Sequence, residues 1–227
     1  MRSIFTIVLW LALGAGTASA QVGPTPAELA VYTGLHAAAA RGDVAGIEKR
    51  IAAGDSKEAT DSRQRTPLHV AAFQKQYDAA RALIRLGADP NKLEADRYDI
   101  ITIASVANDL PMLKIALDGG GNARAITSRY DGTALIAAAH LGHAEVVRML
   151  IAAKAPLDHV NNLNWTALIE SIVLGDGGKN HTDTLRALVQ AGANVNIPDR
   201  SGTSPLGLAR GRGYAEMVKI LEAAGAK

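Results

Sequence analysis

The segment Thr66-Pro67-Leu68-His69-Val70-Ala71-Ala72 decides the fold, because versions of it recur along the chain at a nearly constant distance. Thr133-Ala134-Leu135 repeats its opening 67 residues later. A period of about 33 residues indicates an array of stacked units rather than one globular core. We number the units 1 to 6 by their anchor residues, which are Thr33, Thr66, Asp99, Thr133, Thr166 and Ser204.

Each unit carries the signals of two short helices joined by a turn. In unit 2, Thr66 is a good N-cap, and Pro67 suits the first helical turn, where its missing N–H costs nothing. Leu68 and the alanines after it fall on one face at helical spacing. A glycine nine residues after the anchor ends the first helix in units 1, 4, 5 and 6. Asp43 and Asp109 then cap the second helix of units 1 and 3. One such pair cannot bury its apolar face alone, so neighbouring units must stack.

This pattern resembles the ankyrin repeat family, whose signature is T-P-L-H-x-A at a period of 33 residues. The resemblance implies an all-α solenoid over residues 33–227, built from about six helix–turn–helix units with short β-turn fingers. The units are expected to start near residues 33, 61, 94, 128, 161 and 199.

Three stretches depart from the repeat. Residues 21–32 are expected to be an N-terminal extension that begins a capping helix, and we predict one long first helix from Thr25 to Ala40. Unit 3 has Asp99 and Ile100 in place of Thr-Pro. Unit 5 carries five extra residues within 175–184, which we interpret as a longer helix–helix turn, with metal or partner contact left open.

The first twenty residues have the layout of a secretory signal peptide. Arg2 gives a positive start, residues 4–13 form an uncharged apolar run, and Ala18-Ser19-Ala20 supplies small residues before a cleavage point. The apolar run is shorter than the ~20 residues that a transmembrane helix needs. We therefore expect cleavage after Ala20 and a secreted or periplasmic protein with no membrane span in residues 21–227. An uncleaved N-terminal anchor is the alternative.

Composition excludes several classes of protein. Hydrophobic residues make up 48% of the chain but aromatic residues only 4%, which suits closely packed helices and disfavours a β-sandwich. There are 0 cysteines, so disulfides, thiolate metal sites and a cysteine nucleophile are excluded. The net charge of +2 gives no global indication of a nucleic-acid partner.

Aromatic residues and arginines gather where the ankyrin family contacts its partners. The resemblance places those positions four, three and one residues before the anchor, seven and eight after it, and near twenty after it. Five of the seven aromatic residues in 21–227 occupy these positions, and so do six arginines. Asp96 is the only acidic residue among them. Tyr, Trp and Arg dominate binding hot spots. The expected partner-binding residues are Arg63, Arg65, Phe73, Tyr98, Arg129, Tyr130, His140, Trp165, Arg200 and Arg212.

The same aromatic residues allow a structural interpretation, in which they stack on neighbouring fingers and only stiffen the array. We favour binding for the row as a whole, because the core positions hold Ala and Leu instead. The prediction is therefore a concave Arg/Tyr/Trp face that holds a protein partner with an acidic, partly apolar surface.

The sequence offers little for catalysis. His140 and His143 could share a metal ion, but no third ligand is evident, and His143 fills a position that starts the second helix in the family. His36 and His69, three residues after their anchors, correspond to a family position that hydrogen-bonds between repeats. The unit 5 insert lacks the spaced carboxylates of a calcium loop. No nucleophile–base pair stands at a telling spacing, so we expect no catalytic residue, metal or cofactor.

We conclude from the sequence that the chain is an exported, non-enzymatic protein-binding module and a monomer, with no nucleic-acid partner. The alternative is an inhibitor or immunity protein for an exported enzyme or toxin. By analogy alone, a helper of a stress enzyme such as catalase is a third candidate. A metal-dependent enzyme around His140 is the alternative from a different class.

Overall fold

The computed structural model describes residues 21–227, so the predicted signal peptide lies outside the described residues. These residues form thirteen helices and no β-strand, which confirms the predicted all-α class. None of these helices is long and apolar enough to cross a membrane. The helices are α1 Pro26–Val31, α2 Gly34–Arg41, α3 Val44–Ala52, α4 Pro67–Phe73, α5 Tyr77–Arg85, α6 Ile100–Val106, α7 Leu110–Asp118, α8 Ala134–His140, α9 Ala144–Ala152, α10 Ala167–Val173, α11 Lys179–Gln190, α12 Pro205–Gly211 and α13 Ala215–Ala223.

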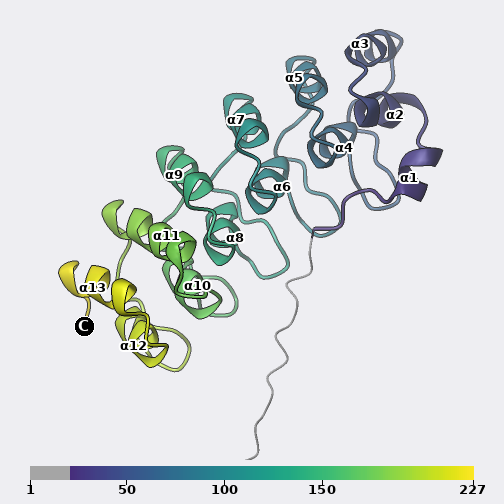
Figure 1. Ribbon diagram of the computed structural model, residues 1–227. Helices are drawn as coiled ribbons and strands as arrows, with labels where there is room; N and C mark the ends of the chain where they lie inside the picture. The colour runs from purple at the N-terminus through teal and green to yellow at the C-terminus, as the bar shows by residue number, and fades with distance from the viewer. Residues whose placement is uncertain (1–20) are drawn as a thin grey trace, which may run out of the picture.

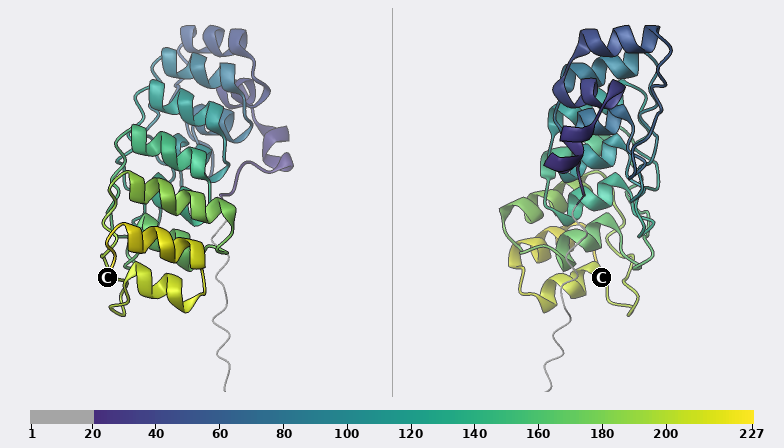
Figure 2. Two further views of the ribbon diagram at one scale, coloured as in Figure 1. Left: turned by 60° about the vertical axis from the view of Figure 1, so that its left-hand side comes forward. Right: turned by 90° about the vertical axis from the view of Figure 1, so that its right-hand side faces the viewer.

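Twelve of the helices form two parallel rows (Figure 1). The first helix of each unit, from α2 to α12, lies in an inner row, and the second helix, from α3 to α13, lies in an outer row. Each helix packs against its partner within the unit and against its counterpart in the next unit. Figure 2 shows the same stacked order from two other sides, with the inter-unit loops along one edge. We call the surface formed by the fingers and the inner helices the inner face.

The core is continuous along the stack and is made of small and aliphatic side chains. Ile101, Leu135 and Leu168 are at most 1% exposed and belong to one buried cluster with the alanines around them. Alanines let neighbouring helices approach closely, and repeating them in every unit produces the alanine-rich composition. Because each unit contacts mainly its neighbours, the array grows in one dimension.

The predicted caps are present. The hydroxyl of Thr66 accepts the backbone N–H of His69, and the His69 ring accepts the backbone N–H of Thr66 in return. Asp99 replaces threonine in unit 3 and still caps α6 by accepting the N–H of Thr102. Asp43 and Asp109 cap α3 and α7 as expected. The anchor of unit 3 therefore still caps its helix, although it is aspartate rather than threonine.

The position nine residues after the anchor has a left-handed backbone in every unit except unit 5, even where glycine is absent. Gly42, Gly142 and Gly213 have φ of 71°, 69° and 71°, while Lys75 and Asn108 occupy the same position with φ of 54° and 51°. Glycine adopts this conformation without the steric cost that other residues bear.

The histidines three residues after the anchors link neighbouring units, as the family resemblance implied. The Nε2 atom of His36 hydrogen-bonds the carbonyl of Arg65 at 2.9 Å, and Nε2 of His69 hydrogen-bonds the carbonyl of Lys92 at 3.0 Å. Burial lowers the pKa of His69 to about 4, although the carbonyls of Lys92 and Tyr98 oppose this effect.

The predicted single helix from Thr25 to Ala40 is wrong. Two helices occupy this stretch, and Tyr32 between them has extended backbone with φ −60° and ψ 138°. Gly34 then adopts φ +57°, which turns the chain into α2. Helix α1 contributes no buried residue and lies outside both rows (Figure 1). The break lets α1 lie against the inner-face side instead of extending the stack.

The insert of unit 5 is more than the longer turn that we expected. Helix α11 runs for 12 residues, whereas the corresponding helices α9 and α13 run for 9. His181, in the added turn, hydrogen-bonds the backbone carbonyl of His140 at 3.0 Å and the Asp176 carboxylate at 2.9 Å. Tyr214 of unit 6 donates from its hydroxyl to the carbonyl of Gly175 at 2.8 Å. The insert therefore binds units 4, 5 and 6 together.

Candidate protein-binding surface

A polar side chain shapes each finger from within. Asp61 accepts the backbone N–H groups of Arg63 and Arg65, both at 2.9 Å, with one carboxylate oxygen. The equivalent acceptors are Glu94, Ser128, Asn161 and Asp199, five residues before their anchors. Burial raises the pKa of Glu94, whereas the hydroxyl of Ser201 and neighbouring N–H groups lower that of Asp199. These acceptors fix the finger backbone independently of the side chains at its tip.

The residue two before the anchor is left-handed in all five fingers. It is Gln64, Arg97, Asp131, Asn164 or Gly202, with φ of 59°, 66°, 52°, 68° and 81°. Backbone bonds also join neighbouring fingers, since Ala95 N–H donates to the Arg63 carbonyl and Asn162 N–H to the Tyr130 carbonyl, both at 3.0 Å. These bonds join the finger of unit 2 to that of unit 3 and the finger of unit 4 to that of unit 5.

The ten residues expected to bind a partner differ widely in exposure. Arg129, Tyr130, Arg200 and Arg212 are exposed, whereas Arg63, Phe73, Tyr98, His140 and Trp165 are half-buried. Phe73 and Tyr98 pack against the core cluster, and burial raises the pKa of Tyr98. Arg65 is 0% exposed.

Arg65 belongs to the interior rather than to the surface that the sequence suggested. Its Nε donates to Asp61 at 2.7 Å, its Nη2 to Glu28 at 2.5 Å and its Nη1 to the carbonyl of Val22 at 3.3 Å. Tyr32 donates its hydroxyl to the same Asp61 carboxylate. A buried guanidinium with these partners is not available to another protein, so Arg65 is left out of the candidate surface.

This network perturbs the pKa of each of its members. Hydrogen bonds from Thr25, with help from Arg65, lower the pKa of Glu28. Burial alone would raise the pKa of Asp61, but hydrogen bonds from Tyr32 and Arg65 hold it below its ordinary value. Burial raises the pKa of Tyr32. At neutral pH the network therefore holds two carboxylates and one guanidinium.

The arginines of the inner face differ in how far carboxylates neutralise them. Asp96 accepts from Arg63 at 3.0 Å and also pairs with Arg129, so one carboxylate partly neutralises two arginines. Arg200 and Arg212 instead donate to backbone carbonyls of unit 5, at 2.8 and 3.2 Å. Within residues 21–227 no ion pair joins either guanidinium to a carboxylate. Unit 6 therefore presents two exposed arginines that no carboxylate of the described residues neutralises.

Exposed apolar side chains gather on the adjacent units 4 and 5. Tyr130 and Leu163, three residues before their anchors, are 42% and 39% exposed. Leu141 and Leu174, eight residues after, are 38% and 43% exposed. Sequence reasoning missed the three leucines, because it counted only aromatic residues and arginines in the partner-facing positions. We call these four residues the apolar quartet.

His140 lies beside a buried carboxylate on the next inner helix. Its Nδ1 is 3.3 Å from Oε2 of Glu170, whose side chain is only 5% exposed. The other oxygen of Glu170 accepts from the amide of Asn161 at 3.0 Å. The half-buried ring of His140 therefore lies at the inner face with one nitrogen directed at unit 5.

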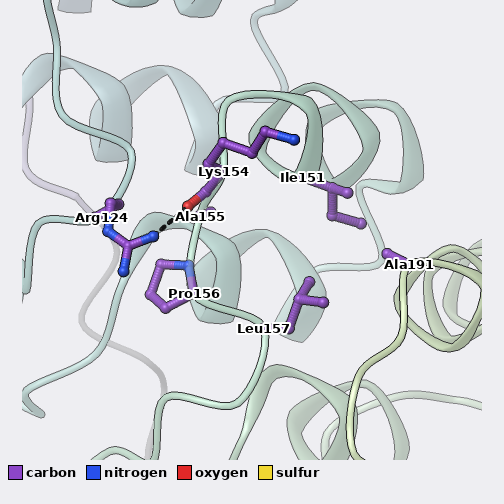
Figure 3. Close-up of a pocket in the computed structure, with 7 residues that line it drawn as sticks. All are labelled: Arg124, Ile151, Lys154, Ala155, Pro156, Leu157 and Ala191. Carbon is purple, nitrogen blue, oxygen red and sulfur yellow. Dashed lines mark hydrogen bonds between the residues drawn. The ribbon is translucent and has the colours of Figure 1, made fainter.

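His140 and His143 belong to no metal-binding cluster in residues 21–227. No group of three or more His, Asp or Glu side chains in residues 21–227 could hold a metal ion. His143 instead hydrogen-bonds the Ser105 carbonyl at 2.9 Å and links α9 to α6. A hollow of about 460 Å³ lies near the ends of the outer helices of units 4 and 5 (Figure 3), where Arg124 donates to the Lys154 carbonyl. Its lining residues are Arg124, Ile151, Lys154, Ala155, Pro156, Leu157 and Ala191.

Comparisons with known proteins agree with the repeat architecture. The family model described as ankyrin repeats, three copies, matches residues 6–94 and 101–199. The chain belongs to the ankyrin repeat family. The ankyrin repeat protein YahD of Escherichia coli K12 is 34% identical over 190 residues, which cover 83% of this chain and 94% of that protein. The ankyrin repeat domain of an Acinetobacter baumannii protein, known from its crystal structure, is 42% identical with a TM-score of 0.81, covering 85% of this chain and 98% of that domain.

A eukaryotic ankyrin repeat relative is also similar. The B-cell lymphoma 3 protein homolog of Mus musculus is 28% identical over 202 residues, 86% of this chain, and these span 44% of that longer protein. Ankyrin repeat domains are protein-interaction modules and are generally not enzymes. The chain therefore carries a domain built to bind protein.

Proposed function

We propose that this chain is an exported, non-enzymatic binding protein that holds one partner protein on the inner face of units 4 to 6. The observation that carries the proposal is the adjacency of the apolar quartet to Arg200 and Arg212. Exposed apolar patches on soluble proteins mark interaction sites. Uncompensated arginines beside them favour an acidic group on the partner.

The proposal places the partner's apolar surface over units 4 and 5 and its carboxylates against unit 6. Half-buried Trp165 lies at the base of the unit 5 finger, between Leu163 and the N-terminus of α10. The unit 2 finger offers less to a carboxylate, because Asp96, Asp61 and Glu28 already pair with Arg63 and Arg65. The partner therefore has an acidic, partly apolar surface, as the sequence led us to expect.

A photo-crosslinking amino acid tests where the partner docks. We would place it at Tyr130 or Leu163 on the inner face and, as a control, at exposed Ala152 on the outer helix α9. The proposal expects both inner positions to capture the same protein and the control to capture none of it. Equal capture at Ala152 would contradict the proposed face.

Affinity measurements with the captured and purified partner test the chemistry. Truncating a hot-spot Tyr or Arg costs more than about 2 kcal/mol, which is roughly 30-fold in affinity. We expect Tyr130→Ala and the pair Arg200→Ala, Arg212→Ala each to weaken binding by at least tenfold. Only the substitution of the two arginines should reduce the salt dependence of binding. Unchanged affinity in all these variants would refute the proposed site, and Lys114→Ala on α7 serves as the matched control.

Export is part of the proposal and rests on the signal-peptide layout of residues 1–20. The mature protein is expected to begin at Gln21. Mass spectrometry of the N-terminal peptide, from protein expressed with its full sequence in a Gram-negative host, checks this point. Protein that retains residue 1 and stays in the cytoplasmic fraction would contradict export without affecting the binding face.

A further inference from the structure

The chain's own N-terminal segment covers the inner face of the first two units. We call residues 21–32 the strap. An added Cβ at Gly23 would lie 3.1 Å from the ring of Phe73, and Pro24 is buried. The carbonyl of Val22 accepts from Arg65. The strap therefore lies between the base of the unit 2 finger and the C-terminal end of α4.

The sequence of the strap explains its conformation. A residue before proline is restricted to extended backbone, and prolines at 24 and 26 impose this on Gly23 and Thr25. Thr25 has φ −69° and ψ 159°, and its hydroxyl then caps α1 in a reciprocal pair with Glu28. The left-handed Gly34 sets the direction in which the strap folds back.

The strap occupies positions that remain accessible in the later units. Arg65 and Phe73 lie one residue before and seven residues after the unit 2 anchor. In units 5 and 4 the same positions hold Trp165 and His140, which are half-exposed at the inner face. The strap therefore occupies, on unit 2, the positions that correspond to those where the proposed function places a partner on units 4 to 6.

The chemistry of the strap also matches that of the proposed partner. It supplies the Glu28 carboxylate and the Val22 carbonyl to Arg65, and apolar backbone to Phe73. Helix α1 adds no buried side chain to these contacts, and Val31 at its end is 75% exposed. Its departure would expose a guanidinium beside an aromatic ring.

We propose that the strap is an intramolecular ligand that occupies the inner face of units 1 and 2 until a partner segment displaces it. This inference rests on the proposed function. The segment that displaces it is extended and proline-containing, with a carboxylate about five residues beyond the residue that contacts Phe73. With the strap in place, a partner is confined to units 3 to 6.

An engineered disulfide measures how firmly the strap is docked. The chain has 0 cysteines, and the added Cβ at Gly23 lies 3.6 Å from Cβ of Phe73, within the usual range for a disulfide. We would titrate Gly23→Cys/Phe73→Cys against glutathione, with Gly23→Cys/Arg212→Cys as the distant control pair. The proposal expects the first pair to form its disulfide at a ratio of reduced to oxidised glutathione at least tenfold higher than the ratio at which the control pair does. Equal closure of the two pairs would overturn it.

The same pair shows whether Glu28 holds the strap. Glu28→Gln keeps the capping box, which accepts Glu or Gln at this position, but removes the charge that faces Arg65. Loss of a charged hydrogen bond lowers an equilibrium constant by about tenfold. We expect this drop in disulfide closure, and no change would overturn the role of Glu28.

Displacement is tested with a synthetic peptide of residues 21–32 added to ¹⁵N-labelled chain. In the Gly23→Cys/Phe73→Cys chain that also carries Glu28→Gln, the peptide should shift the NMR signals of Arg65 and of α4 when the disulfide is reduced, and in the same chain with the disulfide closed it should not. Shifts in both states, or in neither, would overturn displacement. Neither experiment uses the natural partner, so failure here leaves the crosslinking test of the proposed function intact. If the crosslinking test fails instead, disulfide closure still measures whether the strap is docked.

Discussion

Replacing Arg65 by methionine tests whether the buried ion-pair network stabilises the N-terminal units. Met fills most of the space but leaves Asp61 and Glu28 without their cation. Removing one partner of a buried pair costs about 3–5 kcal/mol, because the remaining charge stays desolvated. Glu28 is 29% exposed and can turn to water, while Asp61 keeps its N–H and hydroxyl donors. The expected loss is therefore at the lower end, about 3 kcal/mol.

Arg129→Met is the matched control. Its side chain is 55% exposed and pairs with Asp96, and an exposed pair contributes only about 0–1 kcal/mol. For a chain of this size, 3 kcal/mol corresponds to a fall in Tm of about 6–12 °C. Urea unfolding and hydrogen exchange of α1, α2 and α4 measure the loss and show where it occurs.

Removing the stranded carboxylates should partly restore stability. Adding Asp61→Asn and Glu28→Gln to Arg65→Met removes the stranded charges, and Asn161 shows that asparagine can fill the finger position of Asp61. The triple variant should therefore be more stable than Arg65→Met alone, because contacting residues are not additive. If Arg65→Met matched Arg129→Met, or if the triple variant were the least stable, the argument from buried charge would be refuted.

Three further results are expected. Burial lowers the pKa of His69 to about 4 from 6.5, so the unfolded chain binds the proton more readily. Stability should then fall by roughly 3 kcal/mol as pH drops from about 6.5 to 4, and His69→Gln should flatten that slope in urea titrations. Glu28 and Asp61 have lowered pKa values in the fold, so their contribution is complete above about pH 4 and lost below it, with exchange protection of α1 lost first. Gly202→Ala should destabilise by about 1 kcal/mol because its φ is +81°, whereas Gly211→Ala, in α12 and with open space around it, should stabilise by about 0.5–1 kcal/mol in thermal melts.

Local signals in the sequence predicted the stacked part of the fold well. Caps at Thr66, Asp43 and Asp109 and the helix end at Gly42 depend on side chains within a few residues of the backbone groups that they satisfy. Such contacts recur from unit to unit, so the repeat period of the sequence is enough to predict them. Unit 3 shows the strength of this reasoning, since Asp99 replaces a threonine and still caps its helix.

The errors arose where contacts are distant in sequence. Arg65 pairs in the interior with Glu28, 37 residues earlier in the sequence. The local pattern of unit 2 does not predict that partner. The single helix expected from Thr25 to Ala40 failed because helix propensity does not reveal that Gly34 reverses direction. Leu141 and Leu174 were missed because only aromatic residues and arginines were counted in the partner-facing positions, and leucine is common in cores.

The internal acceptor in each finger has a consequence for how such a chain diversifies. Asp61, Glu94, Asn161 and Asp199 hold the finger backbone through their own side chains, so the loop shape does not depend on the residues at the tip. Substitutions at the tip positions other than the left-handed residue two before the anchor can then change recognition at little cost in stability. The five fingers act as a display scaffold, and a library randomised only at their tips should yield mostly folded members with new specificities.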